Sequence, residues 1–486
     1  MTHRAACSAP LRRSVADHTT CRLAVAHRER FHRATFLFSA TAKYSFHFFS
    51  MTTTSTLTFD AAGFEAFLAS RKDEPQWLTD LRRESFSHAD AMDWPARRSE
   101  EWIRTDIRTF QINKFAPPVE ATAGDVPAVH QLRDGVEPGG VLETYDSQVI
   151  SESLDEELAA KGVIFGSLER LCREQPDKVR PFLYTVVDPD YDKFAALHAA
   201  FWSGGQFLYV PRGVVIEKPI YLGSTLSDGG TDTAHTLIVL EDGAEATVLH
   251  ECNSANPEAA GLHMGAVELI QKPGSHLRYV NVQEWGHKTY HFAHQQANID
   301  RDSQLQWTIA AMGSGLSKVN QSVDMVGAGA NCQVNGVMFT EGRQHLAYHT
   351  QQYHRAPNCH SDFLYKSAQQ DKSRTVWRGM IKVDKVAQKT DGYQRNDNLV
   401  LSNHSRADSI PGLEIEADDV RCTHGSTTAK VDEEQIFYAR CRGFTQKEAT
   451  RMIVSGFFQQ IFDRITIESV RDALAAAIAR QVREYE

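Results

Sequence analysis

The sequence predicts a mainly β protein: a right-handed parallel β-helix-like solenoid core flanked by N-terminal and C-terminal α-helical regions. The spacing of apolar residues changes from a helical period to a period of two after Gly205, and it becomes helical again near residue 433. Turn residues recur within the β part at intervals of 26 to 31 residues, which is typical of stacked repeats. These turns fall at Gly243, Gly274, Ser303, Gly329 and Asn358.

Residues 1–50 differ in composition from the rest of the chain. They hold eight Lys or Arg residues and two acidic residues, whereas the whole 486-residue chain has a formal charge of −10. Two interpretations remain open: a transit-type targeting peptide, or upstream sequence translated from a misassigned start, with Met51 as the natural one. In both cases this extension lies outside the predicted fold.

Residues 51–200 form the predicted N-terminal helical region. Asp60 is a suitable N-cap for a helix whose apolar face carries Phe64 and Phe67. Two further segments with helical periodicity are residues 74–89 and 191–202. The second of these stops at a pair of glycines, which is a typical helix stop signal.

Residues 201–432 form the predicted β core. Each segment reads as a strand, a turn and a second strand, with no helix between successive segments. One repeat cannot bury its apolar face alone, so stacking of neighbours is the simplest way to build a continuous core. A sandwich of irregular hairpins is the alternative, but the nearly constant turn spacing favours the solenoid.

Residues 433–486 form the predicted C-terminal helical region. Thr445 followed three positions later by Glu448 is a capping-box pattern, and a wide apolar stripe follows it. The stripe either caps the end of the solenoid, or caps it and also docks a partner protein. The candidate docking residues are Ile453, Phe457, Phe458, Ile461 and Phe462.

Composition excludes several classes of function. Outside the extension the chain is acidic, which argues against a nucleic-acid partner, and no run of about 18 apolar residues indicates a membrane span. The eight scattered cysteines contain no CxxC, so they favour a reducing compartment and argue against a self-contained iron–sulfur cluster. There is no phosphate-binding loop and no GxSxG elbow. Dispersed acids argue against a carbohydrate-active β-helix enzyme.

Cys422 and His424 are the candidate metal ligands. They stand two residues apart on a predicted strand, so they face the same side with Cα atoms about 6.5–7 Å apart. Thiolate and imidazole together suit iron, zinc or copper(I). The alternative is that the cysteine is a small core residue and the histidine a satisfied core group.

Four more histidines follow a neighbouring part of the predicted core, and they are weaker ligand candidates. His345 and His349 are too far apart on a strand to share a metal with ease, and polar faces of the stacked repeats explain the cluster otherwise. They are His345, His349, His354 and His360.

Three stretches resemble the SufB/SufD family of iron–sulfur cluster assembly scaffold proteins. They are "FWSGGQFLYVPRGVVIEKPIYL", "IVLEDGAEATVLHE" and "DDVRCTHGSTTAKVDEEQIFYARCRGFTQKEATRMIVSGF". The resemblance runs from about residue 195 to about residue 470, and more weakly to "PARRSEEWIRTDI" near residue 100. It implies a non-enzymatic scaffold, with a β-helix core as its fold.

The resemblance also distinguishes the two paralogues. SufD-type members carry the Cys-x-His motif that Cys422 and His424 match, whereas SufB-type members carry His-Glu where this chain has His424-Gly425. SufB-type members also have a cysteine where Ser405 stands, and a hydroxyl cannot replace a thiolate as a soft-metal ligand. The chain therefore resembles SufD.

The partners and cofactors are those that the resemblance implies. A SufD-type chain pairs with a SufB-like paralogue through the β-helices, and a SufC-like ATPase docks on the C-terminal helices. A transient iron–sulfur cluster or iron is expected at the subunit interface, with reduced flavin as an electron source in the complex. We further expect a homodimer when the chain is isolated and a cytoplasmic location, unless residues 1–50 are a transit peptide. A structural solenoid without a ligand role is the alternative function.

Overall fold

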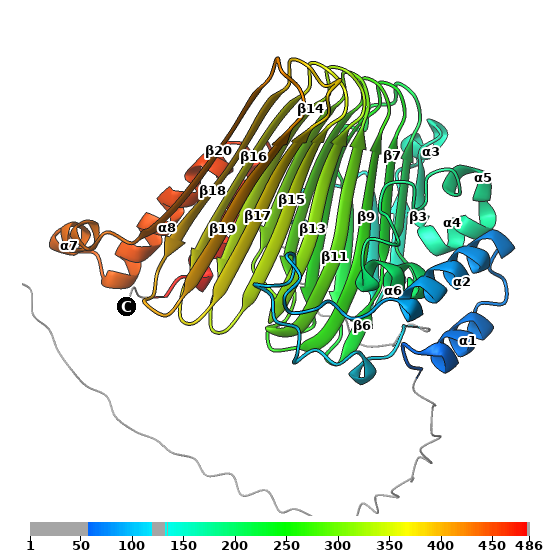
Figure 1. Cartoon of the computed structure of the whole chain (residues 1–486), viewed down its shortest axis with the longest axis horizontal. Coiled ribbons are helices and arrows are strands. Elements are labelled where there is room, and N and C mark those ends of the chain that lie inside the picture. Colours follow the sequence, from blue (N-terminus) through cyan, green and yellow to red (C-terminus); the bar gives the residue numbers. More distant parts are fainter. Residues whose placement is uncertain (1–56, 119–131, 134, 484–486) are drawn as a thin grey trace, which may run out of the picture. The chain divides into compact units, whose positions relative to one another are not determined.

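The core of the protein is a two-sided parallel β-solenoid, which confirms the predicted mainly β architecture. The computed structural model describes residues 57–118, 132–133 and 135–483, so the predicted extension lies outside the described residues. From β8 onward the chain alternates between two ten-stranded sheets, called sheet A and sheet B (Figure 1). Every strand pair in this part is parallel and in continuous register.

The strands of sheet A, in sheet order, are β2 (Gln148–Leu154), β1 (Gly140–Tyr145), β5 (Ile220–Leu226), β8 (Glu245–Ser254), β10 (His276–Glu284), β12 (Gln304–Ala311), β14 (Asn331–Thr340), β16 (His360–Gln369), β18 (Asp391–Val400) and β20 (Arg421–Lys430). The strands of sheet B are β19 (Arg406–Ile415), β17 (Arg374–Val383), β15 (His345–His354), β13 (Leu316–Met325), β11 (Lys288–Ile299), β9 (Ala260–Gln271), β7 (His235–Leu240), β4 (Gln206–Val210) and β3 (Ile164–Ser167). The short β6 (Gly230–Asp232) pairs with β9 and is the tenth strand of sheet B.

The helices of the described chain are α1 (Ala61–Ser70), α2 (Gln76–Ala91), α3 (Glu156–Ala160), α4 (Leu168–Glu174), α5 (Pro176–Val179), α6 (Lys193–Phe201), α7 (Glu433–Cys441), α8 (Gln446–Phe462) and α9 (Glu468–Gln481). One 3-10 turn spans Ile112–Lys114.

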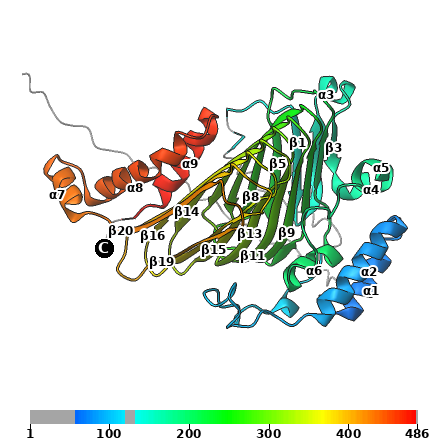
Figure 2. The ribbon, with the colours of Figure 1, turned by 45° about the horizontal axis from the view of Figure 1, so that its top comes forward.

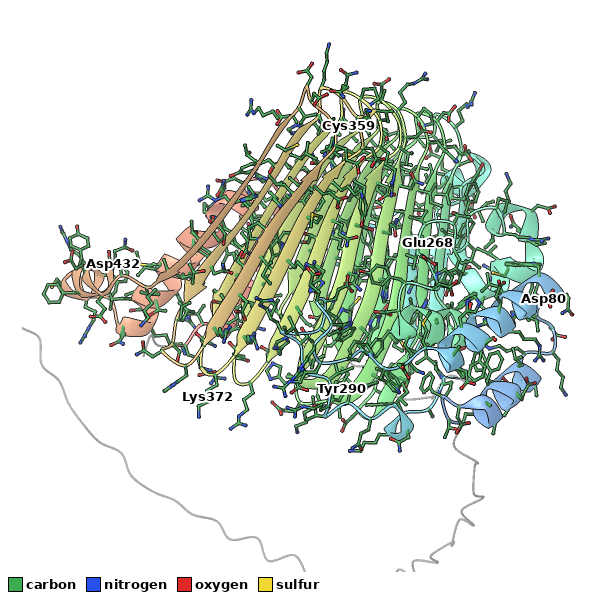
Figure 3. The ribbon with its side chains drawn as sticks, in the orientation of Figure 1. Asp80, Glu268, Tyr290, Cys359, Lys372 and Asp432 are labelled. Carbon is green, nitrogen blue, oxygen red and sulfur yellow. The ribbon has the colours of Figure 1, made fainter. Side chains whose placement is uncertain are left out.

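The predicted turns form one edge of the stack, where Cys359 is labelled in Figure 3. Successive turns are joined by backbone hydrogen bonds, such as Gly274 N to Arg301 O at 2.8 Å and Asn358 N to Gln388 O at 2.9 Å. Each turn needs a residue in the left-handed region, which favours glycine or asparagine. Gly274 has φ 69° and Asn358 has φ 60°. At the predicted turn around Ser303, the left-handed residue is the neighbouring Asp302.

Two helical regions cover the outer faces of the two sheets. On sheet B, α6 packs through Phe194, whose ring stacks 3.9 Å from that of Phe292 on β11. The predicted Asp60 cap is present, because its carboxylate accepts a hydrogen bond from Gly63 N at 2.9 Å. The loop before α6 is held by buried Glu268 of β9, which accepts hydrogen bonds from the backbone of that loop (Figure 3).

The C-terminal helices α8 and α9 pack on the outer face of sheet A (Figure 2). The predicted capping box is present, with Glu448 N donating to Thr445 Oγ1 and Thr445 N donating to Glu448 Oε2. Apolar side chains of sheet A, such as Val337 and Leu364, meet those of the helices in one buried cluster. The helices therefore complete a hydrophobic layer outside the solenoid, besides the core between the sheets.

The two ends of the solenoid differ. At the N-terminal end, the short strands β2 and β3 each join their sheet in antiparallel orientation. These strands and β1 lie within residues 51–200, which the sequence placed in a helical region. At the C-terminal end, β19 and β20 each pair with one neighbouring strand, so their outer edges are unpaired in the described chain. Among the described residues, no helix combines the length and apolar character that crossing a bilayer requires.

Candidate functional site

The open C-terminal end carries Cys422 and His424, both on β20. Alternation along the strand points the two side chains to the same side, as predicted. This side faces between the two sheets, because Cys422 contacts the small cluster around Ile381 of β17. No further coil of the described chain covers β20, so the inward face of the last coil is accessible from the end of the solenoid.

The Cys422 thiol is half-buried against the previous coil. It lies above Gly392 of β18, where an added Cβ would be 3.3 Å from the Cys422 sulfur and 3.5 Å from His354 Nε2. Burial raises the pKa of the thiol, and the nearby Asp391 carboxylate adds to this rise. The thiol is therefore protonated when unligated, and it must lose its proton to bind a metal.

The His424 imidazole is exposed at the open end. Its register partner on β18 is Gln394, a fully buried residue whose amide donates to Gly412 O of β19 at 2.9 Å. No group of three or more His, Cys, Asp or Glu side chains placed to hold a metal ion occurs in the described part of the chain. The pair of Cys422 and His424 is thus at most half of a metal site, and a second chain would have to supply the remaining ligands.

Ser405 lies in the turn between β18 and β19. Its hydroxyl donates to the backbone oxygens of Gln369 at 3.1 Å and Ser402 at 3.0 Å. The Ser405 hydroxyl therefore stabilises the turn between β18 and β19. A hydroxyl that is bound to backbone oxygens in this way is consistent with Ser405 not being a soft-metal ligand.

The four histidines that were weaker candidates are not brought together. His345 and His349 face outward from sheet B, where His345 Nε2 contacts Thr105 Oγ1 at 3.2 Å. His354 faces inward and contacts Ser361 Oγ at 2.8 Å, whereas His360 is close to Asp391 on the turn edge. Burial is the main reason that the pKa values of His345, His349 and His354 fall to about 4, 2 and 3.

These depressed pKa values predict a pH-dependent stability. In the unfolded chain the same histidines bind protons near their ordinary pKa of 6.5, whereas in the folded chain they stay neutral to much lower pH. Their contribution is therefore present above pH 6.5 and is lost as the pH falls from 6.5 toward 3. Each histidine contributes up to about 1.4 kcal/mol per pH unit in this window.

We expect the urea midpoint of unfolding, measured by circular dichroism, to be lower at pH 5 than at pH 7. His354→Gln should make this fall smaller, and the same substitution at exposed His404 is the matched control. A urea midpoint that does not change between pH 7 and pH 5 would contradict the assignment of buried neutral histidines.

The predicted docking residues divide into two groups. Phe458, Ile461 and Phe462 are buried against sheet A, with exposures of 0%, 0% and 3%. Ile453 and Phe457 are partly buried and lie at the border of the same cluster. The first group therefore packs the helix onto its own sheet, and only the second group is accessible to another molecule.

An open apolar groove of about 700 Å³ lies between α7 and α8. Besides Ile453 and Phe457, it is lined by Tyr438 of α7 and Met452 of α8, which are 61% and 53% exposed. Sequence reasoning missed these two residues, because it placed the docking surface only on the apolar stripe that holds Ile453 to Phe462. The signal that it overlooked is the acidic first turn after Asp432, which caps α7.

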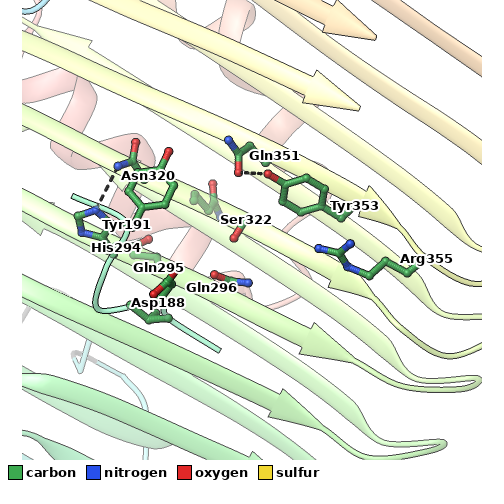
Figure 4. A pocket seen from close by; sticks show the side chains of 12 residues that line it. Asp188, Tyr191, His294, Gln295, Gln296, Asn320, Ser322, Gln351, Tyr353 and Arg355 are labelled. Atoms are coloured by element: carbon green, nitrogen blue, oxygen red, sulfur yellow. Dashed lines mark hydrogen bonds between the residues drawn. The ribbon is translucent and has the colours of Figure 1, made fainter. Parts of the chain in front are cut away.

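A second, polar pocket lies on the outer face of sheet B (Figure 4). Its groups largely bond to one another: Asn320 contacts His294 at 3.2 Å, and Tyr353 donates to Gln351 at 2.6 Å. Arg355 at its rim donates to Asp324 at 2.9 Å. We therefore place the candidate site at the open end of the solenoid.

The fold and the site together define a class: β-solenoid proteins whose open end presents a cysteine and a histidine on the last strand. Within this class, the chain belongs to the SufBD family of iron–sulfur cluster assembly proteins. The family description "SUF system FeS cluster assembly, SufBD core domain" matches residues 224–457, and "SufBD protein N-terminal region" matches residues 68–222.

Curated relatives agree with this assignment. The iron–sulfur cluster assembly protein SufB of Bacillus subtilis (strain 168) is 29% identical over 412 residues, which cover 82% of this chain and 88% of that protein. A SufBD family protein of Staphylococcus epidermidis (strain ATCC 12228) is 28% identical over 414 residues, with the same coverage of 82% and 88%. A SufBD family protein of Staphylococcus saprophyticus is also 28% identical over 414 residues.

Proposed function

We propose that this chain is the SufD-type subunit of the SUF scaffold, which pairs with a SufB-like chain through its open end. The observation that carries the proposal is the position of Cys422 and His424 on the last strand, next to an unpaired edge. An unpaired edge is a template for strand addition by another chain. A second chain that pairs there would bring its own ligands to the same place.

The chemistry of the half-site supports a transient role. Two ligands cannot hold an iron–sulfur cluster, which is usually bound by four thiolates, so the cluster would be shared between chains. A neutral imidazole exchanges readily and lets the cluster leave. Iron and sulfur are here the cargo of the scaffold, and the chain itself is not an enzyme in this proposal.

The SufD type is supported by two positions. Ser405 replaces the cysteine of SufB-type members, and its hydroxyl is engaged with backbone oxygens. Gly425 follows His424 where SufB-type members carry a glutamate. A chain without these groups lacks the sulfur acceptor that the SufB type provides, so it acts as the partner.

The groove between α7 and α8 is the proposed docking surface for a SufC-like ATPase. It is open, apolar and bordered by the acidic residues Asp432 and Glu434. A cytoplasmic location, a homodimer of the isolated chain and reduced flavin in the complex remain predictions.

Co-expression tests the proposal directly. We expect this chain to co-purify with a SufB-like and a SufC-like chain, and anaerobic preparations to show iron–sulfur absorption after iron and sulfide are supplied. The same preparation without this chain is the control. If the two other chains form the same cluster equally fast on their own, the SufD-type role is wrong.

Charges placed at the open end should block the pairing. Leu413 and Ile415 on β19 are 37% and 41% exposed at this end. We expect Leu413→Lys with Ile415→Lys to abolish co-purification of the SufB-like chain, because inward-pointing lysines prevent edge pairing. The ATPase should still bind. The matched control is Val386→Lys, because the Val386 side chain lies on a turn and is 68% exposed. Normal pairing by the double variant would exclude this end as the interface.

A further inference from the structure

A charged row interrupts the apolar outer face of sheet A under α8. Lys366 of β16, Asp397 of β18 and Thr427 of β20 are register partners across the last three strands. The same row continues in β14 as Val337, which belongs to the buried apolar layer. Lys366 and Asp397 are 7% and 3% exposed, so the row brings two opposite charges into a nearly water-free place.

Hydrogen bonds connect the row to the strand that carries the half-site. Thr427 Oγ1 donates to Asp397 Oδ1 at 2.6 Å, and Lys366 Nζ lies 3.9 Å from Asp397 Oδ2. Arg395 Nε also donates to Asp397 Oδ1 at 3.0 Å, so the carboxylate has two cationic neighbours. Thr427 is three residues from His424 on the same strand.

The other end of the row reaches α8. Lys366 Nζ donates to the backbone oxygen of Phe457 at 2.9 Å, and the ammonium lies 4.8 Å from the centroid of the Phe457 ring. Phe457 in turn lines the groove between α7 and α8. One side chain therefore lies against both the wall of the docking groove and the carboxylate that accepts a hydrogen bond from Thr427 of β20.

The Lys366 ammonium is buried, so the loss of its hydrogen-bond partners costs free energy. Desolvation lowers the pKa of Lys366, and Asp397 partly offsets this effect. A lysine in such a place is stable only while its hydrogen-bond partners are in position. Displacement of Phe457 by a docked molecule would remove a hydrogen-bond partner of the ammonium and change its position relative to Asp397, the carboxylate that Thr427 also contacts.

We propose that Lys366 is a positioning residue that couples occupancy of the α7–α8 groove to the position of β20. This inference rests on the proposed function, because it assigns the groove to a partner and β20 to the half-site. An ATPase that moves α8 would thereby move the strand that carries Cys422 and His424. The coupling is reciprocal, so a change in β20 also alters α8.

A second anchor of α8 provides the matched control. Arg464 Nη1, just beyond the end of α8, lies 3.0 Å from Asp362 Oδ2 of β16 and contacts Asn335 of β14. This anchor also joins the helix region to sheet A through an ion pair, and its polar partners lie on β16 and β14 and not on β18 or β20. A purely structural role of Lys366 would therefore be matched by Arg464.

Hydrogen exchange on the isolated full chain tests the link without any partner. Thr427→Val keeps the shape of the side chain and removes the bond to Asp397, and Thr427 is exposed, so folding is not at risk. We expect this variant and Lys366→Met to speed exchange of the amides around Phe457 by about fivefold, which is the effect of one lost hydrogen bond. Unchanged exchange in α8 for Thr427→Val would overturn the inference.

The assembled complex tests the direction that matters for function. We expect the bound ATPase to change amide exchange in residues 421–430 in the unaltered chain and in Arg464→Met. In Lys366→Met the ATPase should still bind, but exchange in residues 421–430 should not respond. Equal responses in Lys366→Met and the unaltered chain would overturn the coupling. Failure of the unaltered chain to bind an ATPase would instead refute the proposed docking surface, and the measurement on the isolated chain would still decide the link.

Discussion

Replacing Cys422 and His424 by alanine is expected to lower the rate of cluster formation in the co-expressed complex by at least about tenfold. Mutation of a residue that supports a metal site commonly lowers metal affinity or activity by about this factor. The expected result follows from the half-site, since among the described residues the pair belongs to no group of three or more side chains that could hold a metal ion. The rate of appearance of iron–sulfur absorption under anaerobic conditions is the measurement.

The control for this prediction uses the same residue types elsewhere. Cys441 and His404 are both exposed and lie away from the inward face of the last coil. We expect Cys441→Ala with His404→Ala to form clusters at the unaltered rate. If the Cys422 and His424 variant also does so, the ligand role is wrong and the chain acts only as a structural partner.

Introducing charge into the groove between α7 and α8 is expected to weaken ATPase binding by about 100-fold, because exposed aromatic and methionine side chains at the centre of an interface often act as binding hot spots. The change is Tyr438→Asp with Met452→Asp, at residues that are 61% and 53% exposed. Because neither side chain is buried, the β core should remain folded. Titration calorimetry with the ATPase measures the effect.

The neighbouring Phe437 supplies the control for the groove. It is 70% exposed but does not line the groove, so Phe437→Asp should leave the affinity nearly unchanged. Phe458→Asp would be a poor test, because Phe458 is fully buried and a charge there would detach α8 from its own sheet. If the Tyr438 and Met452 variant still binds the ATPase tightly, the groove between α7 and α8 is not the docking surface.

The solenoid was predictable because its signal is local and repeated. Each turn needs a left-handed residue, so glycine or asparagine recurs at the interval of one coil. The strands β1, β2 and β3 carry no such repeat, and they lie among helices in the sequence. β1 and β3 join the sheets through strands far along the chain, β5 and β4, which no local pattern shows, and β2 joins through its hairpin with β1.

The candidate site was predictable in part. Alternation along one strand fixed the common direction of Cys422 and His424, and this needs no knowledge of the rest of the fold. The burial of Phe458, Ile461 and Phe462 was not predictable, because an apolar stripe looks the same whether its own sheet or another protein covers it. The side of α8 that remains accessible depends on how the helix packs on sheet A.

The difference between the two ends of the solenoid has a consequence for assembly size. The antiparallel strands β2 and β3 end the two sheets at the first end, whereas parallel strands with unpaired outer edges end them at the last coil of the described chain. When two chains of this kind meet tip to tip, both sets of free edges are consumed. Growth is then self-limiting: such molecules form finite pairs, and they have no route to fibres through this surface.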